Sequence, residues 1–545
     1  MLTTIPALLR QAAQDAAEIE ALVDGDVRMT FAELDAAVTR FARAVVAHGL
    51  EPGDRVAVWA PNSAEWVVSA LGVLAAGGVL CPVNTRFRGE EARYAIAKVR
   101  ATMVILDDTF LRANYLAALR GDGPPPAVGR PVPLLPSVRT VVDLSGAAGR
   151  EQAGAGVWSL AGFTALADQV DPAVVDGRIA ALDPEGMADI LFTSGTTGYP
   201  KGAMVSHASN LRVDLQWARL VGLRRGDRYL MVNPFFHSFG YRAGILACLI
   251  MRATIIPVAV FDVGTVLRLV ERERVTVFPG APTVYTSLLE HPDFGAYDVS
   301  SVRLAVTGAT IVPVPLLRRM REELGFRDVI TAYGLTETCG TATVCPPDAD
   351  LERISTSCGR AIPGTELRIA GLDGQALPAG ESGEVLVRGY NVMLGYFEDP
   401  VATAQAIDED GWLHTGDVGW VDEDGYLRIT DRIKDVYVVG GFNVYPAEVE
   451  RVLGEHPVVS DVAVVGVPDA RMGEVGRAFV QTVPDWSGDE SVLVDELEAW
   501  CRERLANFKR PRSFNVVPAL PRTPSGKIQK FKLTTARGPD TPDQT

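Results

Sequence analysis

Short apolar runs alternate with amphipathic helical patterns along most of the chain. Helical patterns at residues 64–76 and 263–274 lie between runs that predict β-strands. This rhythm is typical of βαβ units, in which crossover helices join parallel strands. We therefore expect an α/β fold whose large N-terminal domain has parallel-rich sheets flanked by helices. The predicted strands are residues 55–59, 102–106, 229–232, 254–257, 275–278 and 304–307.

A different pattern begins near residue 381. Short alternating runs at residues 383–388 and 425–430, each closed by turn residues, predict a small β subdomain. A compact α+β pattern follows, and a chain of 545 residues is too long for one core. We therefore expect a large domain over residues 1–431, joined by a hinge to a small, mobile α+β domain over residues 432–545. The predicted elements of the small domain are a helix at 446–453, strands at 459–467 and 478–482, and a helix at 491–505.

The composition is ordinary for a soluble enzyme, with 47% hydrophobic and 22% charged residues. A formal net charge of −16 argues against a nucleic-acid partner, because polyanion binding leaves a basic footprint. The six cysteines are scattered without a Cys-x-x-Cys pair, which disfavours zinc and a disulfide framework. No signal-peptide pattern opens the chain, and the apolar stretch at residues 244–260 is too short to span a membrane, so we expect a cytoplasmic protein. The oligomeric state is not readable, and a homodimer stays open.

Residues 193–202 read Thr-Ser-Gly-Thr-Thr-Gly-Tyr-Pro-Lys-Gly and follow an apolar run. The glycines let backbone amides approach phosphate oxygens, the hydroxyls add donors, and Lys201 adds a positive charge. The order is not that of a Walker A loop, because Pro200 precedes the lysine and Gly202 follows it. A flexible surface loop is the alternative, but the complete pattern favours a loop that binds nucleotide phosphates.

Further motifs follow in order. Residues 331–337 read Thr-Ala-Tyr-Gly-Leu-Thr-Glu, and residues 413–417 read Leu-His-Thr-Gly-Asp. Residues 431–435 read Asp-Arg-Ile-Lys-Asp, and residues 521–530 read Pro-Arg-Thr-Pro-Ser-Gly-Lys-Ile-Gln-Lys. With these motifs the chain resembles, over nearly its whole length, the adenylate-forming (ANL) superfamily, which comprises acyl-CoA synthetases, peptide-synthetase adenylation domains and beetle luciferases.

The resemblance implies a nucleotide site. Tyr333 would stack on adenine, Thr336 would bond the α-phosphate, and Asp417 would accept hydrogen bonds from the ribose hydroxyls, although such an aspartate alone is more often a turn or capping residue. Glu337 would hold Mg²⁺ together with Thr196, because a hard divalent cation prefers carboxylate and phosphate oxygens. Thr336 and Glu337 would thereby take part in catalysis. The other residues assigned to ATP are Thr193, Ser194, Gly195, Thr197, Gly198, Lys201, Gly308, Ala309, Gly334 and Arg432.

The C-terminal motifs imply a mobile catalytic group. The resemblance makes Lys527, and not Lys530, the catalytic lysine that reaches the substrate carboxylate and the α-phosphate. A positive charge there lowers the barrier as two anions approach each other. Lys434 would lie at the hinge between the domains. After domain rotation, Gly440 and Gly441 would leave room for the pantetheine arm of coenzyme A.

The acyl pocket is expected around residues 233–242, which read Asn-Pro-Phe-Phe-His-Ser-Phe-Gly-Tyr-Arg. Phe236, Tyr241 and Arg242 would line it, and His237 would act as a gate and catalytic residue, although a histidine beside aromatic residues is more often part of a core. Arg242 is an unusual neighbour for an apolar pocket, because a guanidinium must be paired or meet a polar group of the ligand. It either recognises a substrate carbonyl or faces solvent.

The resemblance implies an AMP-forming acid–thiol ligase that uses ATP, Mg²⁺ and coenzyme A. The carboxylate would attack ATP, acyl-AMP would form, and the thiol would then displace AMP. Within the superfamily the chain resembles actinobacterial ligases for the bicyclic dione propanoate (HIP) left from sterol C and D rings, which implies a role in steroid and cholesterol degradation. A medium- or long-chain fatty acid ligase is one alternative, and a stand-alone adenylation enzyme with another acceptor is a further one. A non-enzymatic sensor is disfavoured, since Lys527 and Glu337 are both present.

Overall fold

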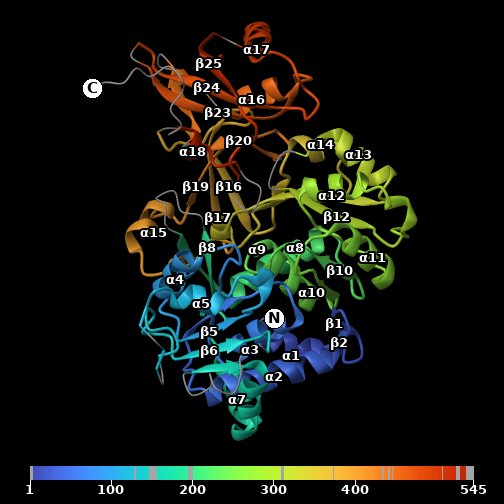
Figure 1. Ribbon diagram of the computed structural model, residues 1–545, viewed down its shortest axis with the longest axis vertical. Helices are drawn as coiled ribbons and strands as arrows, with labels where there is room; N and C mark the ends of the chain where they lie inside the picture. Colours follow the sequence, from blue (N-terminus) through green and yellow to red (C-terminus); the bar gives the residue numbers. More distant parts are fainter. Residues whose placement is uncertain are drawn as a thin grey trace. The chain divides into compact units, whose positions relative to one another are not determined.

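The first large sheet of the computed structural model has the strand order β18-β9-β8-β4-β3-β5-β6-β7 (Figure 1). The strands from β8 to β7 run parallel, whereas β9 and β18 are antiparallel to their neighbours. The strands are β3 (Arg55–Trp59), β4 (Val79–Pro82), β5 (Met103–Leu106), β6 (Thr140–Asp143), β7 (Val157–Ser159), β8 (Met187–Thr193), β9 (Lys201–Ser206) and β18 (Gly395–Tyr396). The structure describes residues 4–124, 126–127, 130–146, 156–193, 200–308, 312–371, 373–432, 435–439, 442–444, 446–469, 471–505, 507–522 and 528–534.

Helices cover both faces of this sheet. Val56 and Val58 of β3 belong to a core that also contains residues of α2 and α3, whereas Ala57 and Trp59 belong to a second core with α4 and α5. Successive side chains of a strand point to opposite faces, so a strand buried on both faces is continuously apolar. The helices of this part are α1 (Ile5–Asp15), α2 (Phe31–Ala47), α3 (Ala64–Ala75), α4 (Gly89–Lys98), α5 (Tyr115–Arg120), α6 (Leu160–Thr164) and α7 (Pro172–Ala181).

The second large sheet consists of two halves, β10-β11-β1-β2 and β12-β13-β14-β15. Val277 joins them through single parallel bridges to Tyr229 of β10 and Leu304 of β12. The prediction of a strand at residues 275–278 is therefore wrong, because Val277 makes isolated bridges instead of a continuous ladder. The strands are β1 (Glu20–Asp24), β2 (Val27–Thr30), β10 (Arg228–Met231), β11 (Thr254–Pro257), β12 (Leu304–Gly308), β13 (Asp328–Tyr333), β14 (Thr343–Val344) and β15 (Arg360–Ala361).

Two layers of helices flank the second sheet (Figure 1). On one face α11, α12 and α13 pack in a core with Leu230, Ala305 and Val329. On the other face α8 and α10 pack in the core that the first sheet shares. Among the residues that the structure describes, no helix is both long and apolar enough to cross a membrane. The helices are α8 (His207–Leu220), α9 (Ser238–Gly240), α10 (Ala247–Met251), α11 (Val263–Glu273), α12 (Pro282–Leu289), α13 (Val314–Glu322), α14 (Leu351–Thr356) and α15 (Pro400–Ala406).

The remaining chain forms two smaller sheets. One has the order β16-β17-β19-β20, and the other has the order β22-β21-β24-β23 with β25 beside β24. Helices α16 and α17 pack on the second of these sheets in a core of their own. The elements are β16 (Thr365–Ala370), β17 (Gly383–Gly389), β19 (Leu413–Val421), β20 (Leu427–Arg432), β21 (Tyr437–Val439), β22 (Phe442–Val444), β23 (Val459–Asp469), β24 (Gly473–Thr482), β25 (Ser513–Val516), α16 (Pro446–Gly454), α17 (Glu490–Arg504) and α18 (Lys530–Thr534).

The chain divides into two compact units. The larger comprises residues 1–367, 387–414 and 425–427, and the smaller comprises residues 368–386, 415–424 and 428–545. The expected fold class, a large α/β part with a small β subdomain and a C-terminal α+β part, is confirmed. The domain boundary between residues 431 and 432, and the hinge placed there, stay predictions.

Candidate functional site

The sheet holds both ends of the predicted phosphate loop. Thr193 is the last residue of β8, Lys201 is the first of β9, and the two residues pair in the antiparallel ladder. The neighbouring Gly202 packs against β8, since a Cβ there would lie 2.6 Å from Ile190 Cγ2. The remaining predicted loop residues, Ser194, Gly195, Thr196, Thr197 and Gly198, lie outside the described residues.

The second motif, residues 331–337, spans the carboxyl end of β13, next to the end of the parallel strand β12. Tyr333 is the last residue of β13, and Gly308, the last residue of β12, pairs with Ala332 beside it. Ligands of α/β sheets bind at the carboxyl ends of strands, where loops diverge. The fold therefore brings Gly308 and Tyr333 close together at one edge of the sheet, whereas Ala309 lies outside the described residues.

A tight turn follows Tyr333. The Leu335 amide donates to Thr338 Oγ1 at 2.8 Å, and the Gly340 amide donates to the Leu335 carbonyl at 2.8 Å. Gly334 is required here, because a Cβ would lie 2.2 Å from the Gly340 carbonyl oxygen. The turn presents Thr336 and Glu337 on one short 3₁₀ segment. The predicted phosphate and metal residues are thus held by a closed hydrogen-bonded loop.

Hydrogen bonds fix Glu337 at both its main chain and its side chain. The Met393 amide donates to the Glu337 carbonyl at 2.9 Å, and the Tyr396 hydroxyl donates to Glu337 Oε1 at 2.8 Å. The same tyrosine lies beside the phosphate loop, because Lys201 Nζ is 4.9 Å from the centre of its ring. Tyr396 was not predicted, and only its place after a glycine marks it in the sequence. It connects the two motifs.

Arg242 lies in the interior of the protein, in an ion pair. It is completely buried in the π-helical turn Tyr241–Leu246, so a solvent-facing guanidinium is wrong. Its Nη2 pairs with Asp189 Oδ1 at 2.5 Å, and its Nη1 reaches the Thr336 carbonyl at 3.4 Å. Asn210 donates to the other oxygen of Asp189 at 2.6 Å. In the sequence, the only sign of this pair is the charged Asp189 inside the apolar strand β8. Contact of Arg242 with substrate stays a prediction.

The other residues of the predicted acyl pocket lie beside α9. His237 is exposed, and its Nδ1 accepts a hydrogen bond from the Phe239 amide at 3.2 Å, which caps that helix. Phe236 is half-buried. Tyr241 is buried, with its ring centre 6.1 Å from that of Trp66, and burial raises the pKa of its hydroxyl. His237 is thus a surface residue and not a core residue, and its role as a gate stays a prediction.

The remaining predicted residues belong to the smaller unit. Asp417 is buried on β19, and its amide donates to Thr415 Oγ1 at 3.1 Å. Arg432 ends β20, and its side chain is outside the described part. Their ribose contacts stay predictions. Predicted residues that the described ranges omit are Lys434, Gly440, Gly441 and Lys527.

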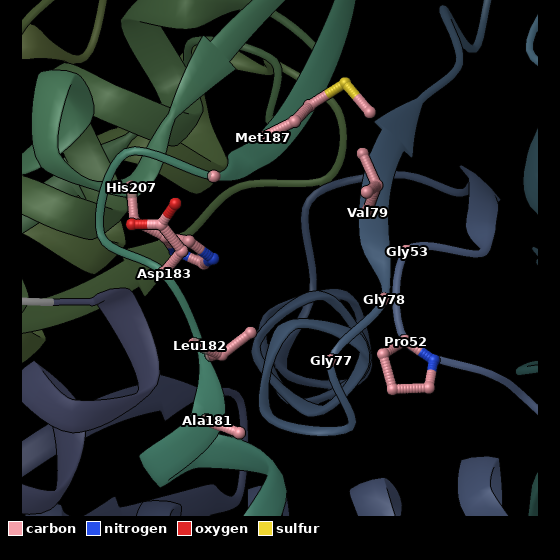
Figure 2. Close-up of a pocket in the computed structure, with 11 residues that line it drawn as sticks. Pro52, Gly53, Gly77, Gly78, Val79, Ala181, Leu182, Asp183, Met187 and His207 are labelled. Carbon is pink, nitrogen blue, oxygen red and sulfur yellow. The ribbon is translucent and has the colours of Figure 1, made fainter.

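A cavity of about 230 Å³ lies elsewhere, at the amino ends of β4 and β8. Figure 2 shows His207 and Asp183 on one side of it, with Gly78 and Pro52 on the other. Burial lowers the pKa of His207 to about 4, so this imidazole is neutral near pH 7. None of the predicted site residues that the structure describes lines the cavity, and Thr193 is at the opposite end of β8. The cavity is separate from the candidate site.

Two family models match the chain. The model of the AMP-binding enzyme matches residues 8–397, and that of the AMP-binding enzyme C-terminal domain matches residues 448–527. Among curated proteins, a 3-(7a-methyl-1,5-dioxo-octahydro-1H-inden-4-yl)propanoyl:CoA ligase of Rhodococcus jostii is 48% identical over 97% of this chain and 98% of its own. A ligase of the same name from Mycobacterium tuberculosis is 47% identical over 98% of both chains. The human mitochondrial medium-chain acyl-CoA ligase ACSF2 is 34% identical over 97% of this chain and 87% of its own.

Solved structures agree with the family models. An anthranilate CoA ligase in complex with anthranoyl-AMP has a TM-score of 0.81 and 28% identity, over 98% of this chain and 97% of its own. The o-succinylbenzoate CoA synthetase of Bacillus subtilis, in complex with ATP and a magnesium ion, has a TM-score of 0.77 and 30% identity, over 96% of this chain and 98% of its own. The chain belongs to the family of AMP-binding enzymes.

Proposed function

We propose that this chain is an ATP- and Mg²⁺-dependent ligase that joins a carboxylic acid to coenzyme A through an acyl-AMP intermediate. The observation that carries the proposal is the 48% identity, over 97% of the chain, to a ligase named for a propanoyl:CoA product. The ordered motifs that contain Lys201, Glu337 and Lys527 support the same reaction class. A cytoplasmic location is proposed with it.

The described donors fit ATP with Mg²⁺. Magnesium sites in nucleotide enzymes use one or two carboxylates together with phosphate oxygens, and Glu337 offers a carboxylate held in place by Tyr396. The aromatic ring of Tyr333 suits adenine, and the ammonium group of Lys201 suits phosphate. ATP would supply the α-phosphorus that the carboxylate attacks, with pyrophosphate as the leaving group.

The chain's own residues would act by position and charge. Lys527 would lie between the attacking carboxylate and the α-phosphate, where one preorganised cationic contact is worth about 10²–10³ in rate. Thr336 would bond the α-phosphate, and Asp417 would orient the ribose. Gly440 and Gly441 would admit the pantetheine arm for the second half-reaction. No nucleophilic side chain is needed, because the substrate carboxylate and the thiol are the nucleophiles.

We propose HIP, the acid named in the two bacterial relatives, as the substrate, and steroid-ring degradation as the setting. Three buried hydrogen-bond donors near the predicted pocket support this choice: Trp66 Nε1, Tyr241 Oη and Arg242 Nε have no hydrogen-bond partner among the described residues. An unpaired buried donor costs about 1–3 kcal/mol, so a ligand with carbonyl acceptors would relieve that cost. HIP offers two ketones, whereas a saturated acyl chain offers none.

The test is CoA- and ATP-dependent AMP release across a panel of acids that contains HIP, octanoate, palmitate and a cinnamate. A ring acid with the HIP skeleton but without ketones is the matched control. Strong preference for HIP over this control supports carbonyl recognition. Preference for a linear acid would contradict the sterol-ring substrate and leave the ligase assignment standing. Release of AMP with no acid at all would contradict the ligase assignment. Acyl-AMP that hydroxylamine traps without transfer to CoA would indicate a stand-alone adenylation enzyme.

A medium-chain fatty acid is the second candidate substrate. The 34% identity to human medium-chain acyl-CoA ligase ACSF2 over 97% of this chain favours it. The two candidates make opposite demands on the pocket, because a linear chain leaves the three buried donors unpaired. Comparing kcat/KM for octanoate and HIP therefore separates them.

A further inference from the structure

A short segment connects the predicted phosphate loop with the turn that contains Glu337. Residues 391–397, here called the clasp, lie between β17 and α15, and they include β18. Asn391 is completely buried, and its Nδ2 donates to the Thr341 carbonyl at 3.1 Å, at the end of the turn that contains Glu337. The clasp therefore begins beside the turn that joins β13 to β14 of the second large sheet.

The other end of the clasp is bound to the first large sheet. The Leu394 amide donates to the Met204 carbonyl at 2.9 Å, and the Phe397 amide donates to the Gly202 carbonyl at 2.8 Å. Met204 and Gly202 belong to β9, the strand that Lys201 begins. The clasp thus ties the phosphate-loop strand to the turn that presents the predicted metal ligand.

Tyr396 is the side chain on which these two connections meet. The residue is 9% exposed, its hydroxyl donates to Glu337 Oε1 at 2.8 Å, and its ring centre is 4.9 Å from Lys201 Nζ. Its backbone is fixed as well, because its amide donates to Thr403 Oγ1 at 2.9 Å. A side chain held at its backbone by α15 and at its hydroxyl by Glu337 has little freedom to move.

We propose that Tyr396 is a positioning residue that orients the Glu337 carboxylate for Mg²⁺ and the Lys201 ammonium for phosphate. The inference rests on the proposed use of ATP and Mg²⁺. A hydrogen bond to one carboxylate oxygen sets the direction of the other, and one oxygen is enough for a magnesium ligand. Partners of this kind behind a metal ligand are worth about 10–100-fold in metal affinity.

The two contacts of Tyr396 reinforce each other. A cation over an aromatic face is attracted by the negative potential of the ring. Donation from the phenol to a carboxylate pushes electron density into the ring, so it strengthens that attraction. The hydroxyl and the ring therefore serve different groups of the nucleotide site, and substitutions can separate them. Tyr396→Phe removes only the hydroxyl, and Tyr396→Leu removes the ring as well.

ATP binding by calorimetry tests the proposal without any knowledge of the acid. Each variant is titrated with ATP in Mg²⁺ and again in EDTA. We expect Tyr396→Phe to weaken binding in Mg²⁺ about tenfold and to leave binding in EDTA within about twofold. Tyr396→Leu should weaken binding under both conditions, because Lys201 loses its aromatic partner. Tyr390→Phe is the matched control, since the Tyr390 hydroxyl donates to the Pro363 carbonyl at 2.9 Å and not to Glu337.

A double-mutant cycle separates positioning from a general loss of structure. If Tyr396 acts through the carboxylate, Tyr396→Phe should have almost no further effect on Mg²⁺-dependent binding in a Glu337→Gln background. Additive losses in the cycle, or unchanged binding by Tyr396→Phe in Mg²⁺, would overturn the proposal. Failure of the parent enzyme to bind ATP would instead refute the proposed function.

Discussion

Arg242 and Asp189 form a completely buried ion pair, with 2.5 Å between Nη2 and Oδ1. The guanidinium also reaches the Thr336 carbonyl, so the pair links β8 to the turn after β13. A charge in the interior persists only when it is paired and hydrogen-bonded. The pair therefore has a structural role beside any contact of Arg242 with substrate.

Removing one partner of this pair should destabilise the protein. Arg242→Met leaves Asp189 buried without its cation, which typically costs about 3–5 kcal/mol. Urea unfolding measures the loss. The double variant Arg242→Met/Asp189→Leu should recover much of it, because two apolar side chains carry no uncompensated charge. A double variant as unstable as the sum of the single variants would contradict this account.

The same residue tests carbonyl recognition when substrates are compared. Arg242→Met should lower kcat/KM for HIP more than for the ketone-free ring acid, because a HIP carbonyl would lose the Nε donor that it accepts from. A role confined to the ion pair predicts equal losses for both acids, since Thr336 serves every substrate. The ratio of the two kcat/KM values, measured against the parent enzyme, distinguishes the two roles.

The turn after Tyr333 should not tolerate a side chain at Gly334. Gly334→Ala places a Cβ 2.2 Å from the Gly340 carbonyl oxygen, so the backbone that carries Thr336 and Glu337 must shift. We expect a fall in acyl-AMP formation of about 10² or more, because a small misplacement of positioned groups costs that much. Gly177→Ala is the control. It lies in α7, where the new Cβ has no atom within 4 Å apart from its chain neighbours and its own helix backbone, and it should leave the rate unchanged.

Lys527→Ala should separate the two half-reactions. Pyrophosphate release with acid and ATP is expected to fall by about 10²–10³, because the lysine would stabilise the adenylation transition state. Thioester formation from supplied acyl-AMP should persist, since that step would occur after the lysine has left the site. Equal loss of both half-reactions would refute the assigned role. Lys530→Ala should have little effect on either step.

Protonation of His207 should make the protein less stable in mild acid. Burial lowers the pKa of His207 in the folded state to about 4, and its Nδ1 accepts a hydrogen bond from the Ile5 amide. An unfolded histidine binds a proton near pH 6.5, so the unfolded state gains protons first and stability falls as pH drops from 6.5 toward 4. At pH 5 the loss from this group is about 2 kcal/mol. Urea unfolding of His207→Asn at pH 7 and pH 5 should show a correspondingly smaller difference, and an unchanged difference would contradict the assignment.

The pattern of apolar residues correctly predicted those strands that are apolar along their whole length. The strand at residues 254–257 coincides with β11, because a short, buried parallel strand is apolar throughout. The strand predicted at residues 478–482 extends back to Gly473 in β24. Gly473 and Gly476 weaken a strand pattern, yet long pairing with β23 includes them. The start of β24 is therefore set by its pairing with β23, which local sequence does not reveal.

The sequence motifs identified the candidate site residues but not the residues that hold them in place. Thr193, Lys201, Tyr333 and Glu337 carry their chemistry in contiguous patterns. The fold places the first three at strand ends and Glu337 in the turn after β13. Tyr396 contacts Glu337 across 59 positions of sequence, so no local pattern could reveal it. Asp189 was visible only as a charge inside an apolar run, and its partner could not be assigned without the packing of the π-helical turn.

The brevity of β18 has a consequence for the solubility of the protein. Gly395 and Tyr396 alone form this strand, and they cover the outer edge of β9 in the first sheet. A long uncovered edge offers unpaired amides and carbonyls to other chains, whereas a very short edge strand offers few. Release of these two residues would uncover the edge of β9 at Ala203 and Met204, so aggregation through that edge is expected to accompany any loosening of the clasp.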